Sequence, residues 1–297
     1  MRITVVGAGV IGLTAALRLS EQGHTVRVLA DRFGEETTSA AAAALWLPYL
    51  AEPYERVLGW GTRGLAVLRE LAGVPGAGVR MRTGVERCGG EEPSWLRHVG
   101  EYERVPGGVR VTVPVVDMSI HLPWLAGMLH GRGVSLERGR VARLDEITGA
   151  DLVVNCTGRA AEELVAGERI TPMRGQIVVL EQCGIEEWIV DDIDGEQPMY
   201  VIPREHTVIC GGTLFESADT EPDPVVTQRI LRRCAEEVPA VGTARVLTDR
   251  VGLRPTREEV RLEFGADGVL HCYGHGGSGV TMAYGCAEEV ASLVAGR

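Results

Sequence analysis

The chain has 297 residues, of which 45% are hydrophobic and 24% are charged, and its formal net charge is −11. This balance is typical of a globular protein with one large domain or two intertwined ones, and it argues against a nucleic-acid-binding surface. The 30 basic residues are all arginine, which excludes a lysine Schiff base and the lysine of a P-loop. No apolar run reaches the ~20 residues of a membrane span, so neither a nucleic acid nor a membrane is an expected partner.

The first 31 residues predict a strand, a helix and a second strand. Short apolar runs at 3–6 and 25–29 flank a segment, 13–22, whose apolar residues have helical spacing. Gly23 is a typical helix stop. This order predicts a βαβ unit and therefore a parallel sheet. The chain starts without a signal-peptide pattern, so we expect a cytoplasmic protein.

The connection from the first strand to the helix reads Gly7-Ala8-Gly9-Val10-Ile11-Gly12, which is the dinucleotide-binding pattern GxGxxG. Gly7 makes the tight turn, Gly9 clears space for a pyrophosphate, and Gly12 lets helix and strand pack closely. Asp31 follows the second strand at the distance expected of a ribose ligand. The pattern favours a dinucleotide site over a merely tight turn, but it does not choose between NAD and FAD.

The middle of the chain mixes helical and β-like segments without a repeat or a low-complexity linker. A polar turn at 37–39 leads into five alanines, 40–44, whose composition favours a helix. Helices are also predicted at 56–71, 119–131 and 227–238. Strands are predicted at 134–141, 151–155, 177–180, 199–202 and 207–210, with strands and loops of a second sheet over 74–116.

Elements typical of dinucleotide-binding proteins lie at 1–50, 130–170 and 248–297, and β-rich pieces lie at 51–129 and 171–247. We therefore expect two discontinuous domains. One is an α/β, Rossmann-like cofactor-binding domain with a parallel sheet, and the other is an interleaved β-rich α+β substrate-binding domain. Their shared interface is a common place for a small-molecule site.

A second glycine-rich loop, Gly274-His275-Gly276-Gly277-Ser278-Gly279, precedes an alanine-rich helical segment at 282–294. Glycine lets the backbone come close to a flat or anionic partner, and the amides that open the next helix point at it. Two such loops at opposite ends of the chain suggest one long cofactor held at both ends. For His275, a local structural hydrogen bond is favoured over a catalytic role.

Three further segments are candidates for the site, at 151–158, at 252–255 and at 199–203, which contains Tyr200. The buried strand 151–155 is followed by Thr157-Gly158 and can return the chain to the cofactor. In Gly252-Leu253-Arg254-Pro255, the proline fixes a turn and keeps Arg254 extended, so that its planar guanidinium can face a carboxylate. For Arg254, the alternative to a role in the site is a surface arginine on a rigid turn. For Tyr200, the alternative is an ordinary core tyrosine.

Neither metal nor hydrolase chemistry is predicted, since the chain has no HExxH and no GxSxG pattern. The seven cysteines lack CxxC spacing, and we expect reduced, mostly buried thiols. Cys234 and Cys286 both fall on predicted helices, and a disulfide between some pair stays open.

Taken together, these segments resemble the D-amino acid oxidase family of flavoproteins almost from end to end. The order and spacing of the motifs carry the resemblance more than any single motif does. The motifs are Val5-Val6-Gly7-Ala8-Gly9-Val10-Ile11-Gly12-Leu13, Ala30-Asp31-Arg32-Phe33, Ala43-Ala44-Leu45-Trp46-Leu47-Pro48-Tyr49, Val154-Asn155-Cys156-Thr157-Gly158, Arg174-Gly175-Gln176, Gly211-Gly212-Thr213, Gly252-Leu253-Arg254-Pro255 and Tyr273-Gly274-His275-Gly276-Gly277-Ser278-Gly279-Val280-Thr281.

The resemblance implies FAD bound in an elongated form. It assigns the pyrophosphate to Gly7, Gly9 and Gly12, the ribose to Asp31, phosphate oxygens to Thr37 and Thr38, and the adenine to Val141. It places Ala44 and Leu45 on one side of the isoalloxazine ring and Gly276, Gly277, Ser278, Gly279, Val280 and Thr281 on the other. Further implied cofactor-binding positions are Ala8, Val10, Ile11, Arg32 and Thr157.

The resemblance also implies how a D-amino acid is held and oxidised. Arg254 would pair with the substrate carboxylate, assisted by the Tyr200 hydroxyl, and the Gly277 carbonyl would accept a hydrogen bond from the amine. The Cα–H bond would then transfer a hydride to flavin N5 without a side-chain base, so catalysis is mainly orientation. The imino acid hydrolyses to a 2-oxo acid and ammonia, and dioxygen reoxidises the flavin to give hydrogen peroxide. A homodimer is an expectation that stays open.

The chain departs from the family pattern around the substrate. Residues 195–199 carry no aromatic side chain where mammalian members have a second tyrosine, and Leu47 and Ser278 stand where glutamine and an aromatic residue are frequent. We therefore predict a shorter lid and a roomier pocket for bulky neutral D-amino acids. Leu214 stands where D-aspartate oxidases tend to carry an arginine, which argues against acidic substrates.

Alternatives remain within and outside this family. A glycine- or sarcosine-type amine oxidase and a D-aspartate oxidase would share the fold. An NAD-dependent dehydrogenase would use the first glycine motif in the same way. A non-catalytic flavin-binding protein would keep the cofactor residues and make no use of Arg254.

Overall fold

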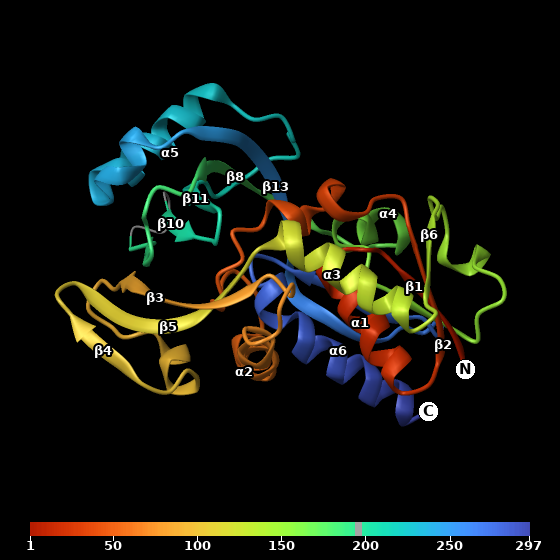
Figure 1. Cartoon of the computed structure of the whole chain (residues 1–297). Helices are drawn as coiled ribbons and strands as arrows, with labels where there is room; N and C mark the ends of the chain where they lie inside the picture. Colours follow the sequence, from red (N-terminus) through yellow and green to blue (C-terminus); the bar gives the residue numbers. More distant parts are fainter. Residues whose placement is uncertain (194–197) are drawn as a thin grey trace.

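Figure 1 shows the computed structural model of the chain, which describes residues 1–193 and 198–297. The strands of these residues form one sheet in the order β4-β5-β3-β9-β10-β11-β8-β13-β14-β7-β1-β2-β6, and β12 pairs with β8 beside this path. The strands are β1 (Arg2–Val6), β2 (Thr25–Ala30), β3 (Val79–Arg87), β4 (Tyr102–Val105), β5 (Gly108–Val116), β6 (Ser135–Arg138), β7 (Leu152–Asn155), β8 (Thr171–Glu181), β9 (Trp188–Asp191), β10 (Met199–Pro203), β11 (Thr207–Gly211), β12 (Phe215–Glu216), β13 (Val246–Phe264) and β14 (Leu270–His275). The α-helices are α1 (Val10–Glu21), α2 (Tyr54–Leu71), α3 (Met118–Gly131), α4 (Ala161–Leu164), α5 (Pro224–Glu237) and α6 (Gly279–Ala295).

One half of the sheet is parallel. Strands β14, β7, β1, β2 and β6 lie side by side, with Val5 of β1 opposite Val28 of β2 and Val154 of β7. These three side chains are buried, because α1, α3 and α6 pack beside the strands, with α1 in contact with both other helices (Figure 1). The predicted βαβ opening and parallel sheet are confirmed.

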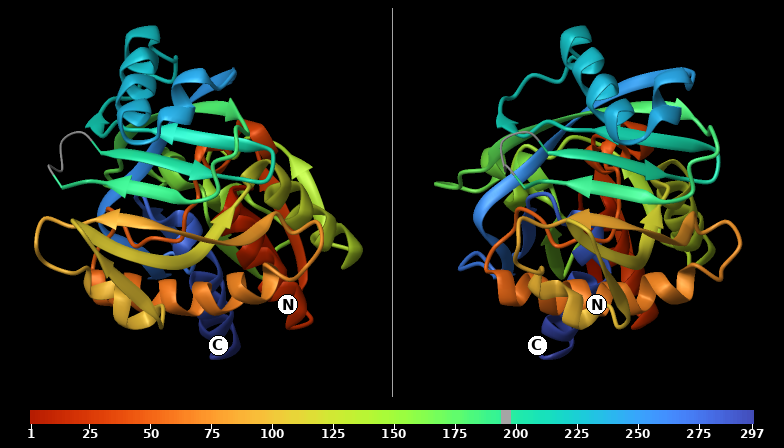
Figure 2. Two further views of the ribbon diagram at one scale, coloured as in Figure 1. Left: turned by 60° about the vertical axis from the view of Figure 1, so that its left-hand side comes forward. Right: turned by 90° about the vertical axis from the view of Figure 1, so that its left-hand side faces the viewer.

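The other half is mostly antiparallel and is built on β13, a strand of 19 residues. Between Val246 and Thr256 this strand pairs with β8, and from Thr256 to Phe264 it pairs with β14. One strand therefore connects the two halves. Figure 2 shows α5 packed against the antiparallel half, where it contacts β8, β10 and β11, and α2 lying along β3 and β5. The fold is α/β with a Rossmann-like part and an interleaved β-rich α+β part, as predicted.

Two local predictions are wrong because tertiary contacts override local preference. The alanine run forms no α-helix: Thr38–Ala41 makes a 3₁₀ turn, and Ala44 takes a positive φ of 60°. Its carbonyl accepts a hydrogen bond from Val116 N at 2.9 Å. The turn expected at 252–255 is instead the interior of β13, although Arg254 is extended as predicted.

All seven cysteines are free thiols. The thiol of Cys234 on α5 lies beside that of Cys210, whereas Cys286 on α6 lies beside Cys272. The two helical cysteines therefore have different neighbours.

Within the described ranges, no helix is both long and apolar enough to cross a membrane. The predicted lid falls partly on 194–197, which lie outside the described residues.

A buried carboxylate, Glu168, anchors the hairpin of β13 and β14. It accepts hydrogen bonds from Arg257 Nε at 2.7 Å, Arg261 Nη1 at 3.2 Å and the Tyr273 hydroxyl at 2.6 Å. Burial alone would raise the pKa of Glu168, but the hydrogen bonds of Tyr273 and Arg257 outweigh it and lower this pKa from 4.5 to about 2. Because the folded state favours the ionised form, this group stabilises the fold above the unfolded-state pKa, and the contribution is lost as the pH falls through the folded-state pKa.

Replacing Glu168 with glutamine is expected to lower the free energy of unfolding by roughly 2 kcal/mol at pH 7, with the loss shrinking toward pH 2. Urea unfolding at several pH values measures this difference. Glu163→Gln is a matched control, because its partner Arg140 is exposed and exposed ion pairs contribute little. An equal loss for Glu168→Gln at every pH would contradict the assignment.

Candidate functional site

A cavity of about 1020 Å³ lies between the two halves of the molecule. Both glycine loops line it, although they are far apart in the sequence. Most of the predicted site residues meet in its wall. They are Gly7, Ala8, Gly9, Val10, Ile11, Asp31, Arg32, Thr37, Thr38, Ala44, Leu45, Val141, Thr157, Tyr200, Arg254, Gly276, Gly277, Gly279, Val280 and Thr281.

Two predicted residues, Gly12 and Ser278, are not among the residues that line this wall. A Cβ on Gly12 would lie 1.9 Å from the Gly7 carbonyl oxygen, so Gly12 permits close packing behind the first loop. The buried Ser278 hydroxyl donates to the Tyr49 carbonyl at 2.6 Å and accepts from the Tyr49 amide. It ties the second glycine loop to the segment that follows the alanine run.

The first glycine loop offers open space at its centre. Gly7 has a φ of +109°, and a Cβ there would lie 2.4 Å from the Cys156 carbonyl oxygen. A Cβ on Gly9 would meet only the Ser39 hydroxyl, at 3.1 Å. The loop therefore needs glycine at position 7 for its own folding, while the surface at position 9 stays clear for a ligand.

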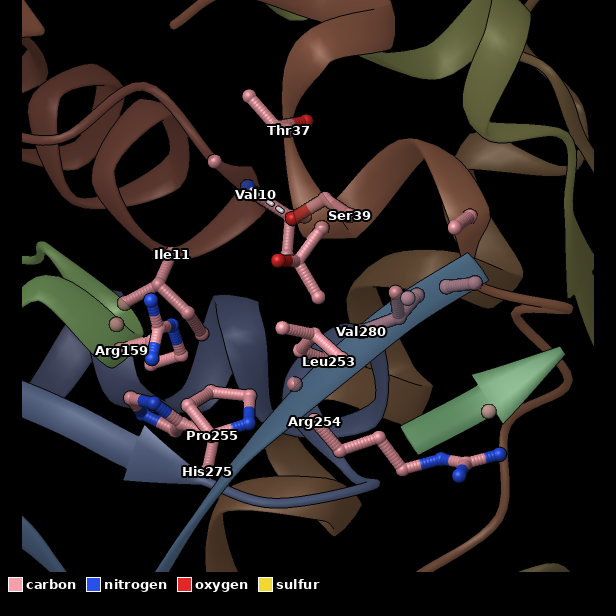
Figure 3. Close-up of a pocket in the computed structure, with 18 of the residues that line it drawn as sticks. Val10, Ile11, Thr37, Ser39, Arg159, Leu253, Arg254, Pro255, His275 and Val280 are labelled. Carbon is pink, nitrogen blue, oxygen red and sulfur yellow. Dashed lines mark hydrogen bonds between the residues drawn. The ribbon is translucent and has the colours of Figure 1, made fainter. Parts of the chain in front are cut away.

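Ser39, to which the sequence analysis assigned no role, also lines the cavity beside the first glycine loop. The Ser39 hydroxyl accepts a hydrogen bond from Val10 N, the first amide of α1, at 3.0 Å (Figure 3). Thr37 lies nearby in the same view, and its hydroxyl donates to the Gly34 carbonyl at 2.7 Å. Hydroxyl groups beside a helix N-terminus form a polar environment for phosphate oxygens. In the sequence, the polar turn at 37–39 was the feature that could have identified Ser39 as a site residue.

The residues expected to hold the adenosine end lie at the carboxyl edge of the parallel strands. Asp31 directly follows β2, and 60% of its side chain is exposed. Val141 lies beyond the end of β6 at Arg138, so the strand predicted at 134–141 is shorter than expected. Both residues line the cavity.

The second glycine loop packs against the segment 47–50. A Cβ on Gly276, whose φ is +51°, would lie 1.8 Å from the Leu50 carbonyl oxygen, and one on Gly277 would lie 2.6 Å from the Tyr49 ring. The Thr281 hydroxyl donates to the Leu47 carbonyl at 2.9 Å. The contacts with Leu50 and Tyr49 require glycine at positions 276 and 277, so these two residues present only backbone to the cavity.

Arg254 enters the cavity from β13, where that strand crosses between the halves. Figure 3 shows its side chain pointing away from the contact between Val10 and Ser39. The guanidinium lies over Gly175, whose Cβ would come within 2.6 Å of it, and Nη1 donates to the Thr213 carbonyl at 3.2 Å. One bond to a carbonyl leaves most of the five guanidinium N–H donors for a ligand.

Tyr200 stands next to Arg254. Its ring covers Gly211, where a Cβ would lie 2.0 Å from the ring carbon Cζ. Burial raises the pKa of the Tyr200 hydroxyl more than the Arg254 charge lowers it. Tyr200 therefore stays protonated at neutral pH and can donate a hydrogen bond to the same ligand as Arg254.

Other side chains to which the sequence analysis assigned no role also line the cavity, and Tyr49, Glu86 and Asp192 are among them. Burial and the neighbouring Asp192 raise the pKa of Tyr49. Burial, together with the charge of Asp192, raises the pKa of Glu86 to about 7. Tyr49 belongs to a motif that carried the resemblance, whereas nothing in the pattern around Glu86 distinguished it from other strand residues.

A buried group behind the second glycine loop was also missed. The ligand atoms of Cys272, His275 and Cys286 lie within 4.8 Å of one another. The Cys272 thiol is 3.8 Å from His275 Nε2, in line with the local structural contact expected of His275. The sequence predicted no metal, and CxxH spacing between positions 272 and 275 was the signal for this grouping.

The cavity fits a long dinucleotide. It is lined by both glycine loops, by hydroxyl groups and amides at the opening of α1, and by the backbone of Gly276 and Gly277. The sequence matches the family model DAO, described as FAD dependent oxidoreductase, over residues 2–293. The chain belongs to this family, and FAD is its cofactor.

Among curated relatives, the D-amino-acid oxidase of Rubrobacter xylanophilus is 46% identical over 98% of this chain and 95% of the relative. That of Streptomyces coelicolor is 45% identical over 98% of this chain and 96% of the relative. The human D-aspartate oxidase is 31% identical over 99% of this chain and 94% of the relative. Among solved structures, the glycine oxidase of Geobacillus kaustophilus has a TM-score of 0.81 at 19% identity and covers 100% of this chain and 95% of its own, which shows the shared fold.

Proposed function

We propose that this chain is an FAD-dependent oxidase that deaminates neutral D-amino acids to 2-oxo acids and ammonia, with dioxygen reduced to hydrogen peroxide. The observation that carries the proposal is the pairing of Arg254 with Tyr200 in a cavity that both glycine loops line. Such a pair offers several donors to one carboxylate. Two relatives named D-amino-acid oxidase, at 46% and 45% identity, support the D configuration.

The residues that would hold FAD divide by the part of the cofactor that they meet. Gly7, Gly9 and the opening of α1 would face the pyrophosphate, Thr37, Thr38 and Ser39 its oxygens, and Asp31 the ribose. Val141 would meet the adenine, and Ala44, Leu45 and residues 276–281 would flank the flavin ring. When bound, the flavin accepts a hydride from the substrate Cα and passes electrons to dioxygen.

The protein itself contributes binding and orientation. Arg254 and Tyr200 would fix the substrate carboxylate, and the Gly277 carbonyl would accept a hydrogen bond from the amine. Together these contacts fix the direction in which the Cα–H bond points. The reacting groups are then already in position, as they are in an intramolecular reaction. Neither Arg254 nor protonated Tyr200 would remove a proton, in keeping with chemistry that needs no side-chain base.

The domain boundaries belong to the same proposal. Residues 1–50, 130–170 and 248–297 would form the FAD-binding domain, and 51–129 with 171–247 the substrate-binding domain. The strand β13 supports this division, since it pairs with β8 on one side and β14 on the other. A cytoplasmic location and a homodimer complete the proposal.

Two alternatives on the same fold differ in their substrates. A D-aspartate oxidase must hold a second carboxylate, and the acidic side chains of Glu86 and Asp192 in the cavity oppose this. A glycine- or sarcosine-type oxidase would be distinguished by turnover of small or secondary amines. An NAD-dependent dehydrogenase no longer competes, because the family uses FAD.

A series of D-amino acids with side chains of different size tests the prediction that the pocket accepts bulky substrates. We expect kcat/KM for D-valine, D-leucine and D-phenylalanine to equal or exceed that for D-alanine, because residues 195–199 carry no aromatic side chain and Leu47 and Leu214 replace polar or charged side chains of relatives. Peroxide-coupled steady-state kinetics provide the measurement. A strong preference for D-alanine would show that the pocket is narrow.

A further inference from the structure

Four buried side chains that can donate sulfur or imidazole nitrogen to a metal meet behind the glycine loops. The ligand atoms of Cys272, His275 and Cys286 lie within 4.8 Å of one another, and the Cys272 thiol is 3.8 Å from His275 Nε2. The Cys272 thiol is also within hydrogen-bonding reach of the Cys156 thiol. All four residues are at most 7% exposed. Three sulfur atoms and one imidazole therefore form one group inside the protein.

The fold brings this group together from three elements. Cys156 directly follows β7, Cys272 and His275 belong to β14, and Cys286 lies on α6. Strands β7 and β14 are parallel neighbours in the sheet. The turn from β14 into α6 is fixed by a hydrogen bond from Ser278 N to the His275 carbonyl at 3.0 Å. Strand pairing and this turn hold the four side chains near one another without a ligand.

The donor atoms and their spacing suit a tetrahedral zinc ion. Protein-bound Zn²⁺ takes four ligands, with Zn–S distances of about 2.3 Å and Zn–N distances of about 2.0 Å. Such a tetrahedron sets neighbouring ligand atoms roughly 3.5–3.8 Å apart, so small side-chain movements would close the observed spacing around an ion. Thiolate and imidazole ligands favour Zn²⁺ over Mg²⁺ and Ca²⁺, which prefer oxygen ligands.

We propose that Cys156, Cys272, His275 and Cys286 bind one Zn²⁺ ion. The cysteines bind as thiolates, and any thiol protons that remain are released to solvent on binding. Cys156, Cys272 and His275 also line the large cavity, which gives the ion a path to the site. The proposal goes beyond the oxidase reaction and does not depend on it.

The ion connects the bases of the two glycine loops. Cys156 packs under the first loop, since a Cβ on Gly7 would lie 2.4 Å from the Cys156 carbonyl oxygen. His275 belongs to the second loop, and Figure 3 draws it among the residues that line the pocket. Because the four ligands meet in this arrangement only in the folded chain, Zn²⁺ stabilises the folded protein.

Metal binding by the purified holoprotein tests the site. After growth in zinc-supplemented medium and dialysis, we expect one Zn²⁺ per chain by elemental analysis. Titration of metal-free holoprotein in competition with a chelating dye gives the Kd, which should rise on the order of 100-fold or more in Cys272→Ser and in Cys286→Ser. Cys210→Ser is the matched control, because it also removes a buried thiol that lies beside another cysteine. It should bind Zn²⁺ like the wild type.

Cd²⁺ provides a second readout on the wild type, in case a variant does not fold. Each cadmium–thiolate bond adds ultraviolet charge-transfer absorption, so one equivalent of Cd²⁺ should give the intensity of three thiolates. Wild-type holoprotein without stoichiometric Zn²⁺, or absorption from fewer than three thiolates, would overturn the site. Zn²⁺ binding that both cluster variants retain, or that Cys210→Ser loses, would also overturn it.

Discussion

Replacing Arg254 with alanine is expected to lower kcat/KM for neutral D-amino acids by about 100- to 1,000-fold, because truncating one member of a buried, hydrogen-bonded ion pair costs about 2–5 kcal/mol. The guanidinium lies over Gly175 and next to Tyr200, and neither of these two residues carries a positive charge. Both KM and kcat should suffer, since the carboxylate contact also orients the Cα–H bond.

FAD should remain bound in this variant, because Arg254 points away from the loop at the opening of α1 (Figure 3). Steady-state kinetics and the visible absorbance of the purified protein measure the two properties separately. Arg232→Ala on the exposed face of α5 is a matched control that removes an arginine outside the cavity. Kinetics of Arg254→Ala equal to those of the control would refute the carboxylate role.

Replacing Gly9 with alanine is expected to raise the Kd for FAD by about 100-fold, because an added methyl group in a closely packed contact costs about 1–3 kcal/mol. The free protein can accommodate that methyl group after a small shift of the Ser39 hydroxyl, the one atom near it, at 3.1 Å. The backbone of Gly9 is extended with φ −74°, which alanine adopts readily. The apoprotein should therefore fold normally and bind FAD poorly.

Titration of the apoprotein with FAD and thermal unfolding without FAD measure these two effects. Gly127→Ala within α3 is the matched control, because its Cβ would meet nothing within 4 Å. It should bind FAD like the wild type. Gly7→Ala should differ from both and destabilise the fold itself, since its Cβ would overlap the Cys156 carbonyl. Unchanged FAD affinity in Gly9→Ala would contradict the position of the pyrophosphate.

The fold was predictable where local patterns were strong. The first βαβ unit, the buried strand β7 and the helix after the second glycine loop follow regular spacings, and the structure contains them as β1, α1, β2, β7 and α6. The segment 74–116 gave only a general expectation of strands, because β3 has an irregular pattern of half-buried residues. The long strand β13 was missed, since Gly252 and Pro255 suggest a turn and only pairing with β8 keeps them extended.

The site was predictable where a motif carried it. The glycine loops, Arg254 and Tyr200 were found through recognisable patterns, and most of them line one cavity. Ser39, Glu86 and Asp192 were missed because their positions depend on strand pairing and loop packing that no short motif encodes. Ser278 was placed beside the flavin, but it is buried and bonded to Tyr49, because its neighbours in space come from the segment 47–50.

The reaction itself is measured most directly by following peroxide release from the purified holoprotein with D-amino acids, L-amino acids, glycine and sarcosine. The expected result is turnover of D-valine, D-leucine and D-phenylalanine, one hydrogen peroxide for each 2-oxo acid, and little turnover of the L-enantiomers. A protein that binds FAD yet oxidises L-amino acids, glycine or sarcosine in preference to every D-amino acid would contradict the proposed function.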